Sequence, residues 1–218
     1  MHQPATHRPF IIIGAGGHAS VVAATLRAIK ASIRGLTDRD PALAGHLVMG
    51  APILGDDGVL DVIDIKSTHI ANGLGIQPKV HGLETPNPGT GLRRRIFETL
   101  TGRAFSFPPL IHPSAVIADA ARIGGGAQVM AGAVVQSRAV ICENAVVNSS
   151  ASIDHDCRIG AHAFIAPGAI LCGGVQVGTG TLICAGAVIL PGVSIGSDAV
   201  INAGAVIRRD VGDQQFAA

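Results

Sequence analysis

The chain has 218 residues, of which 48% are hydrophobic and 14% are charged; its formal net charge is +1 and its mean hydropathy +0.44. This composition is opposite to that of a disordered chain and also excludes a coiled coil. Because the longest basic run is only Arg93–Arg95, the positive charge that drives nucleic-acid binding is missing, and we expect no nucleic-acid partner.

The sequence further predicts a cytoplasmic protein that does not enter a membrane. Its most apolar stretch, residues 10–26, is interrupted by three glycines and is shorter than the roughly 20 apolar residues of a membrane span. The first nine residues contain His and Pro and do not resemble a signal peptide. The four cysteines form no C-x-x-C pair, so we expect reduced structural thiols without a zinc site or disulfide.

Residues 1–107 predict a Rossmann-like α/β subdomain. Residues 10–13 form a buried-strand run, residues 14–18 a glycine-rich turn, and residues 19–30 a helix with Val22, Leu26 and Ile29 on one face. A second strand is expected at 32–37, another ends at 70–73, and a helix at 92–101 stops before Gly102. Residues 77–90, rich in proline, predict a loop near the site, and the sequence leaves open whether this loop closes over it.

The glycine-rich turn suits a phosphate. Residues 14–19, GAGGHA, fit G-x-G-x-x-G/A between strand and helix, where free backbone N–H groups face an anion. Asp38 is the acidic residue expected about 20 positions later to contact a ribose or base. A dinucleotide dehydrogenase is one alternative, but no second mononucleotide half follows, and a nucleotide sugar suits the small module better. A purely structural glycine turn is the other alternative.

Residues 108–218 have a hexapeptide repeat. Every sixth residue from Ile111 to Ile207 is Ile, Leu or Val, and the residue four places later is small or β-branched. The repeat predicts a triangular parallel solenoid, in which the large aliphatic side chain fills the prism, the small residue allows the corner, and three units complete one coil. The domain boundary is therefore placed at Phe107/Pro108.

The residue before each inward aliphatic points outward and distinguishes three faces. The first face carries Leu110, Gln128, Val146, Phe164, Leu182 and Val200; the second carries Val116, Val134, Ser152, Ile170, Val188 and Val206; the third carries Arg122, Val140, Arg158, Gln176 and Ser194. Two largely apolar faces are more than a soluble monomer exposes. The pattern predicts a cyclic oligomer, a homotrimer, with the third face nearest solvent.

The solenoid has one cluster of ionisable residues at a corner, Asp154, His155 and Asp156. A histidine oriented by a carboxylate is suited to act as a general base, although a solvated surface histidine gives the same pattern. His162 is the weaker candidate and His112 is expected to be structural. A zinc carbonic anhydrase needs three convergent histidines, and His155 and His162 supply two, so we expect no metal.

Three segments together resemble a known family: IGAGGH at residues 13–18, HPSA at 112–115, and NSS at 148–150 followed by DHDCRIG at 154–160. They are similar to the sialic-acid O-acetyltransferase and nucleotide-sugar N-acetyltransferase family of hexapeptide-repeat acyltransferases, which includes bacillosamine- and perosamine-type enzymes. The resemblance implies a left-handed parallel β-helix and a homotrimer. It also implies transfer of acetyl from acetyl-CoA to the 4-amino group of a UDP- or GDP-linked deoxy-aminosugar.

The resemblance also implies roles for individual residues. His155 matches the catalytic base and Asp156 its acidic neighbour. The substrate-binding positions are Gly16, Gly17, His18, Asp38 and Gly73, and the acetyl-CoA positions are Phe164, Ala185 and Ala203. Transfer is expected to be direct, without an acyl-enzyme on any cysteine. A sugar or sialic-acid O-acetyltransferase and a non-catalytic β-solenoid scaffold remain as alternative functions.

Overall fold

The computed structural model describes residues 8–76 and 89–218. The N-terminal domain is built on a parallel sheet of order β2-β1-β5, formed by β1 (Phe10–Ile13), β2 (Ile33–Thr37) and β5 (His69–Asn72). Helix α1 (Gly17–Ala28) packs on one face and helix α2 (Gly91–Gly102) on the other. Side chains of a strand alternate between faces, so Ile12 packs with α1 while Ile11 packs with α2. The predicted strand–turn–helix unit is thereby confirmed.

Shorter elements fill the connection between β2 and β5. They are the 3₁₀ helices η1 (Pro41–Leu43) and η2 (Asp57–Asp61) and the hairpin of β3 (Leu47–Val48) with β4 (Ala51–Pro52). Helix α1 ends two residues earlier than predicted, because Lys30 adopts a positive φ of 59° that terminates it. Most of the loop predicted at 77–90 lies outside the described residues. No helix in the described ranges is long and apolar enough to span a bilayer.

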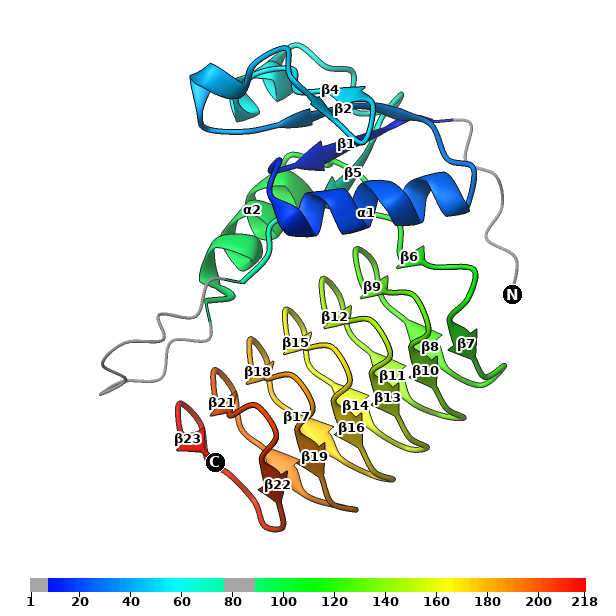
Figure 1. Ribbon diagram of the computed structural model, residues 1–218, viewed down its shortest axis with the longest axis vertical. Helices are drawn as coiled ribbons and strands as arrows, with labels where there is room; N and C mark the ends of the chain where they lie inside the picture. The colour runs from blue at the N-terminus through cyan, green and yellow to red at the C-terminus, as the bar shows by residue number, and fades with distance from the viewer. Residues whose placement is uncertain (1–7, 77–88) are drawn as a thin grey trace.

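The solenoid begins at β6 and consists of two-residue strands in three parallel sheets, seen as stacked coils in Figure 1. The seven-stranded sheet contains β6 (Leu110–Ile111), β9 (Gln128–Val129), β12 (Val146–Val147), β15 (Phe164–Ile165), β18 (Leu182–Ile183), β21 (Val200–Ile201) and β23 (Phe216–Ala217). The six-stranded sheet contains β7 (Val116–Ile117), β10 (Val134–Val135), β13 (Ser152–Ile153), β16 (Ile170–Leu171), β19 (Val188–Ile189) and β22 (Val206–Ile207). The five-stranded sheet contains β8 (Arg122–Ile123), β11 (Val140–Ile141), β14 (Arg158–Ile159), β17 (Gln176–Val177) and β20 (Ser194–Ile195).

The predicted register is confirmed coil by coil. From β6 to β22, partner residues in neighbouring strands differ by 18 positions, as in Ile141 paired with Ile159 and Ile153 paired with Leu171; the terminal β23 pairs with β21 at a spacing of 16. The aliphatic side chains point inward and, with the small corner residues, form one continuous buried cluster. Each coil thus buries its apolar residues only against its neighbours and its own interior, which is how a solenoid replaces a single globular core.

The N-terminal domain lies on the seven-stranded sheet (Figure 1), and this corrects the prediction for the first face. The outward residues from Leu110 to Val200 on that sheet are buried within one chain. Leu110 and Met130 join the core of α1, and Phe164 packs in a cluster with Ile76. The apolar first face therefore docks the chain's own domain. Only the six-stranded sheet, where Val116 is 61% and Ile170 45% exposed, is left as an apolar face.

Candidate active site

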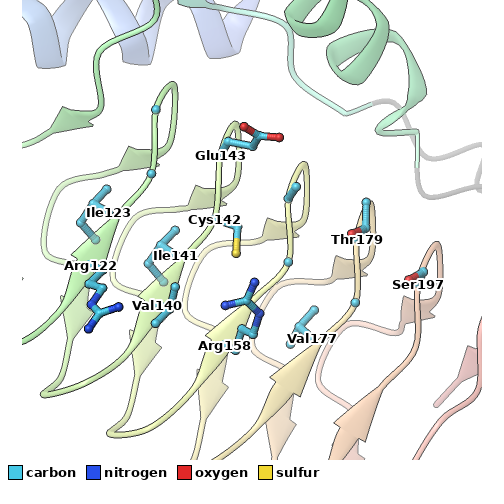
Figure 2. A pocket seen from close by; sticks show the side chains of 15 residues that line it. Arg122, Ile123, Val140, Ile141, Cys142, Glu143, Arg158, Val177, Thr179 and Ser197 are labelled. Atoms are coloured by element: carbon cyan, nitrogen blue, oxygen red, sulfur yellow. The ribbon is translucent and has the colours of Figure 1, made fainter.

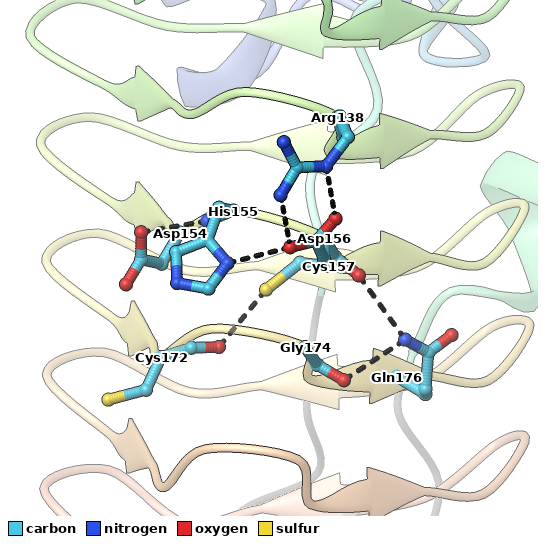
Figure 3. Close-up of polar contacts among 8 residues, drawn as sticks. All are labelled: Arg138, Asp154, His155, Asp156, Cys157, Cys172, Gly174 and Gln176. Atoms are coloured by element: carbon cyan, nitrogen blue, oxygen red, sulfur yellow. Dashed lines mark hydrogen bonds and ion pairs between the residues drawn. The ribbon is translucent and has the colours of Figure 1, made fainter.

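His155 and Asp156 occupy the corner between β13 and β14, where the chain passes from the six-stranded to the five-stranded sheet. We call this row of corners in successive coils the His155 edge; it comprises residues 136–139, 154–157 and 172–175. The imidazole Nδ1 lies 2.8 Å from Asp156 Oδ2 (Figure 3), and both side chains are exposed to solvent. Asp156 is ionised because hydrogen bonds from Arg138, and then from His155, hold the pKa of its carboxyl well below the usual range. An ionised Asp156 accepts a hydrogen bond from Nδ1–H of the neutral imidazole, and in this tautomer Nε2 keeps a free lone pair.

The imidazole rests on the following coil. A methyl group placed on Gly173 would lie 2.6 Å from both Cε1 and Nε2 of His155, so only glycine leaves room for this ring position. On the other side, Asp154 Oδ1 accepts a hydrogen bond from the His155 backbone N–H at 2.7 Å. The backbone of His155 is thus held by its own corner while the side chain lies over Gly173.

The neighbouring cysteine is not a nucleophile. Cys157 points into the prism, and its Sγ donates to the Cys172 carbonyl oxygen at 3.1 Å. Burial raises the pKa of this thiol to about 11, so it carries no thiolate at neutral pH. The cysteine nearest to the base is therefore structural.

The predicted substrate-binding residues lie together at the end of the N-terminal sheet. Gly16 caps α1 without a side-chain hydrogen bond, and Gly16 and Gly17 are exposed, with room beside each Cα because an added methyl group would meet nothing within 4 Å. Asp38 Oδ2 accepts from the Ala15 backbone N–H at 2.9 Å. Gly73 follows β5 and donates its N–H to Ile13 O at 2.9 Å. The turn is open to an anion, and Asp38 holds it in place.

His18 is directed differently from the rest of that turn. Its Nε2 lies 2.9 Å from Gln128 Oε1, and its ring lies 5.9 Å from that of Phe164 on the seven-stranded sheet. Burial, together with the charge of Arg93, lowers the pKa of His18 to about 4. Since Gln128 Nε2 donates to Asn72 O at 2.7 Å, its Oε1 is the acceptor, and His18 must be the neutral Nε2–H tautomer. The imidazole therefore docks the two domains, and His18 would reach a phosphate only through its backbone N–H.

A buried polar cluster beside this contact was not predicted. Arg93, 1% exposed, donates to the carbonyl oxygens of Asn72 and Leu74 at 3.1 and 2.6 Å, and to Asn144 Oδ1 at 3.3 Å. Asn144 also contacts His162 Nδ1 at 3.0 Å. Burial lowers the pKa of Arg93 to about 9, so the guanidinium remains charged at neutral pH. We call Arg93, Asn72, Asn144 and Gln128 the buried polar cluster. Gln128, the polar residue among the apolar outward residues of the first face, was the one sequence signal for this cluster.

The predicted acetyl-CoA residues fall into two environments. Phe164 is buried beneath His18, whereas Ala185 and Ala203 are exposed on successive coils, with Gly204 N–H donating to Ala185 O at 2.9 Å. Both alanines lie at corners between the seven- and six-stranded sheets, which we call the alanine edge. A cofactor along that edge would find backbone groups rather than side chains.

Within one chain the two halves of the predicted site lie on opposite sides of the prism. The His155 edge joins the six- and five-stranded sheets, so it lies opposite the seven-stranded sheet that carries the N-terminal domain. His155 is therefore separated from the glycine turn, and the alanine edge lies across the six-stranded face from it. The structure assembles each half but does not bring them together in a single copy.

A groove that the sequence did not predict runs over the five-stranded sheet and its corners toward α2 (Figure 2). It has a volume of about 640 Å³ and is lined by residues that include Arg122, Glu143, Arg158 and Thr179. None of the predicted site residues lines it. It is an open surface trough and contains no paired acid and base.

No group of three or more His, Cys, Asp or Glu side chains within residues 8–76 and 89–218 is arranged to hold a metal ion. His162 belongs to the corner beneath α2, where its Nε2 lies 3.7 Å from Glu98, while His155 stands on a different edge. Within one chain the two histidines do not converge on one ion.

Comparisons with known proteins agree with this architecture. Residues 9–77 match the PglD N-terminal domain, and residues 156–191 and 174–209 match the bacterial transferase hexapeptide (six repeats) family. No curated protein sequence matches at a significant level.

Solved structures are similar over nearly the whole chain. PerB from Caulobacter crescentus, in complex with CoA and GDP-perosamine, is 33% identical, with 99% of this chain and 97% of that chain covered and a TM-score of 0.85. A structure of a histidine-to-asparagine mutant of the Caulobacter perosamine N-acetyltransferase is 32% identical, covering 99% and 96%, with a TM-score of 0.86. The acetyltransferase domain of PglB from Neisseria gonorrhoeae, in complex with acetyl coenzyme A, is 32% identical, covering 98% and 97%, with a TM-score of 0.85.

Proposed function

The chain belongs to the hexapeptide-repeat sugar acetyltransferases that carry a PglD-type N-terminal domain, and on that premise we propose its reaction. It transfers the acetyl group of acetyl-CoA to the 4-amino group of a UDP- or GDP-linked deoxy-aminosugar, with His155 as general base. The observation that carries the chemistry is the exposed His155 whose Nδ1 is held 2.8 Å from Asp156. The substrate class is supported by PerB, which was crystallised with CoA and GDP-perosamine.

The proposed reaction is a direct transfer in a ternary complex. The sugar amine attacks the thioester carbonyl, and Nε2 of His155 takes the proton that the amine loses as the C–N bond forms. Collapse of the tetrahedral intermediate breaks the C–S bond, and the protonated His155 returns a proton to the departing thiolate of CoA. Asp156 stabilises the imidazolium between these two steps. Backbone N–H groups hold the developing oxyanion.

The open glycine turn is the proposed site of the nucleotide diphosphate. The amides at Gly16, Gly17 and His18 stand at the positive end of α1 and have room for an anion. Asp38 and Gly73 border the same turn through Ala15 and Ile13. We place the nucleoside beside Asp38 and the sugar toward Gly73, with acetyl-CoA along Ala185 and Ala203.

Because these residues lie across the prism from His155, we propose that the site forms between two copies in a homotrimer. The exposed apolar side chains of the six-stranded sheet, including Val116, Ile170 and Val206, are the surface through which copies would associate. Such packing brings the His155 edge of one copy toward the glycine turn and alanine edge of another. A monomer would hold all the residues and still lack the site.

The reaction is tested by thiol release from acetyl-CoA with UDP-, GDP- and dTDP-linked 4-amino sugars, using free sialic acid and serine as controls. We expect release with one amino nucleotide sugar, and a turnover lower by about a hundred- to ten-thousand-fold in His155→Ala. His46→Ala, which removes an exposed histidine of the N-terminal domain, is the matched control and should keep full activity. Release only with sialic acid would indicate an O-acetyltransferase, and failure to bind acetyl-CoA would indicate a scaffold.

The shared site is tested by co-expressing two inactive variants. His155→Ala removes the base, and Gly17→Asp places a negative charge where the diphosphate should bind, at a helix position that accepts aspartate without a steric conflict. In mixed trimers about a quarter of the interfaces should combine an intact turn with an intact base, and activity should return to that extent. A mixture as inactive as its two parents would place the whole site within one copy.

A further inference from the structure

Arg138 stands one coil before Asp156, at the same position of the corner. Its Nε lies 2.6 Å from Asp156 Oδ1 and its terminal NH2 2.8 Å from Oδ2, a two-point contact visible in Figure 3. The backbone supports this stacking, since Asp156 N–H donates to Ser137 O at 3.2 Å. Both residues have φ near 60°, 61° for Arg138 and 60° for Asp156, so their side chains leave the corner in the same way.

The two contacts of Asp156 share one oxygen. Oδ2 receives both the terminal nitrogen of Arg138 and Nδ1 of His155, while Oδ1 is taken by Nε of Arg138. Asp156 therefore cannot rotate about its χ2 bond without breaking the guanidinium contact. The guanidinium is a rigid planar fork, and a two-point contact of this kind fixes a carboxylate in orientation as well as in place.

We propose that Arg138 is a positioning residue for the general base, which fixes the Asp156 carboxylate on Nδ1 of His155 and offsets part of its negative charge. The inference rests on the proposed role of His155. Arg138 itself touches no reacting atom, and it acts through Asp156 alone.

The stability of a single chain does not explain the contact. The Arg138 side chain is 64% exposed and that of Asp156 43%, and ion pairs so open to water add little to folding free energy. The contact places a positive charge beside the carboxylate that faces the imidazole. The charged groups around the imidazole are Asp154 and Asp156 in its own corner and Arg138 in the preceding coil, while the thiol of Cys157 below it is neutral because burial raises its pKa to about 11.

The charge balance gives a directional expectation. With Arg138 present, two carboxylates are offset by one guanidinium; without it, both act on the imidazole unopposed. Protonation of His155 is then more favourable, so the imidazole stops acting as a base at a higher pH than in the natural chain. The acidic limb of the kcat/KM profile should therefore move upward in Arg138→Gln, by about half a pH unit for a unit charge at this range in water.

The test compares Arg138→Gln, Arg138→Lys and Arg122→Gln, the last removing another exposed arginine of the solenoid. We expect Arg138→Gln to lower kcat by about tenfold, since the imidazole is no longer held in place, and to shift the limb. Arg138→Lys should restore the position of the acidic limb because the positive charge returns. It should not restore the full kcat, because lysine cannot form the two-point contact. Arg122→Gln should leave both unchanged.

A second readout separates this inference from the reaction itself. In protein labelled with ¹⁵N-histidine, the NMR titration of His155 should move to higher pH in Arg138→Gln and return in Arg138→Lys, whether or not a substrate has been found. Superimposable titrations in all variants would overturn the role of Arg138. Absence of acetyl transfer in the natural chain would overturn the proposed reaction and, with it, the general base that Arg138 is proposed to position; a shifted titration would then show only that Arg138 changes the charge at His155.

Discussion

Arginine serves two different purposes in this chain. Arg93 is buried between α2, β5 and the solenoid, and no carboxylate of the described residues forms an ion pair with it; carbonyl oxygens and Asn144 hold it instead. Arg138 stands in water and binds a carboxylate at two points. Water cannot replace the hydrogen bonds of a buried charge, so losing one lowers stability. Water readily replaces the partner of an exposed charge, so losing that partner costs little. The buried polar cluster should therefore govern stability, and the His155 edge should govern chemistry.

The largest stability effect is expected from Asn144→Leu. Asn144 is fully buried and has a φ of 52°, which asparagine tolerates and leucine does not. The substitution removes the acceptor that Arg93 NH2 and Asn72 Nδ2 share in Asn144 Oδ1, while their contacts to backbone carbonyl oxygens remain. Together with the backbone strain, it should lower the free energy of unfolding in urea by about 3 kcal/mol or more. Asn144→Asp retains the acceptor and the backbone preference, so it should lose far less. Equal losses in both variants would show that the cluster does not hold the domains together.

A smaller effect at the same interface depends on pH. The pKa of His18 is lowered from 6.5 to about 4 by burial, so between these values the unfolded chain binds a proton that the folded chain does not. Stability is complete above pH 6.5 and is lost as the pH falls toward 4, by about 2 to 3 kcal/mol from this group. Buried His69 and His162 also have lowered pKa values and add to the slope. Thermal melts should show a shallower slope for His18→Gln, and an unchanged slope would contradict the assignment.

Gly173→Ala should affect the other region. The added methyl group displaces the His155 ring, which is the free end of an exposed side chain and can move at little cost in stability. We expect kcat to fall by about tenfold with an unchanged unfolding midpoint. Gly125 occupies the same position of its own hexapeptide, where a methyl group would come no closer than 3.4 Å to any atom, so Gly125→Ala is the matched control. A lower unfolding midpoint with an unchanged kcat in Gly173→Ala would contradict this expectation, because the His155 edge would then affect stability rather than chemistry.

The smallest expected effect is on the stability of Arg138→Gln. Because the ion pair is open to solvent, its removal should not shift the urea midpoint measurably, although it changes the pH profile. If the urea midpoint fell as much as in Asn144→Leu, the contact of Arg138 with Asp156 would be holding the His155 edge together. The assignment of stability to the buried polar cluster and of chemistry to the His155 edge would then be wrong.

How far the sequence could predict the molecule differs between these regions. The solenoid register follows from periodicity alone, because every sixth residue from Ile111 to Ile207 is an aliphatic that points inward, and identical positions stack 18 residues apart. The same spacing places Arg138 against Asp156. The sequence contains this signal, but the pairing becomes obvious only when the coils are stacked. The proposed base, His155, and its acidic neighbour Asp156 are joined by a hydrogen bond, as the sequence order allowed.

The docking of the N-terminal domain could not be predicted in the same way. An apolar outward face shows that something covers it, but not whether the cover is the same chain or another copy. The answer lies in pairs far apart in sequence, such as His18 with Gln128 and Arg93 with Asn144, that no local pattern links. For the same reason His18 was predicted to face the phosphate although its imidazole points into the interface.

The backbone of Asp156 also records a compromise in selection. Its φ of 60° suits glycine better than any side chain, and the two following coils have Gly174 and Gly192 at the equivalent corner, with φ of 75° and 72°. Glycine would relieve the backbone at this corner, although Arg138, Asn144 and His162 show that other corners carry side chains at a similar φ. Directed evolution for thermostability should therefore admit Asp156→Gly, and a parallel screen for the proposed reaction should select against it.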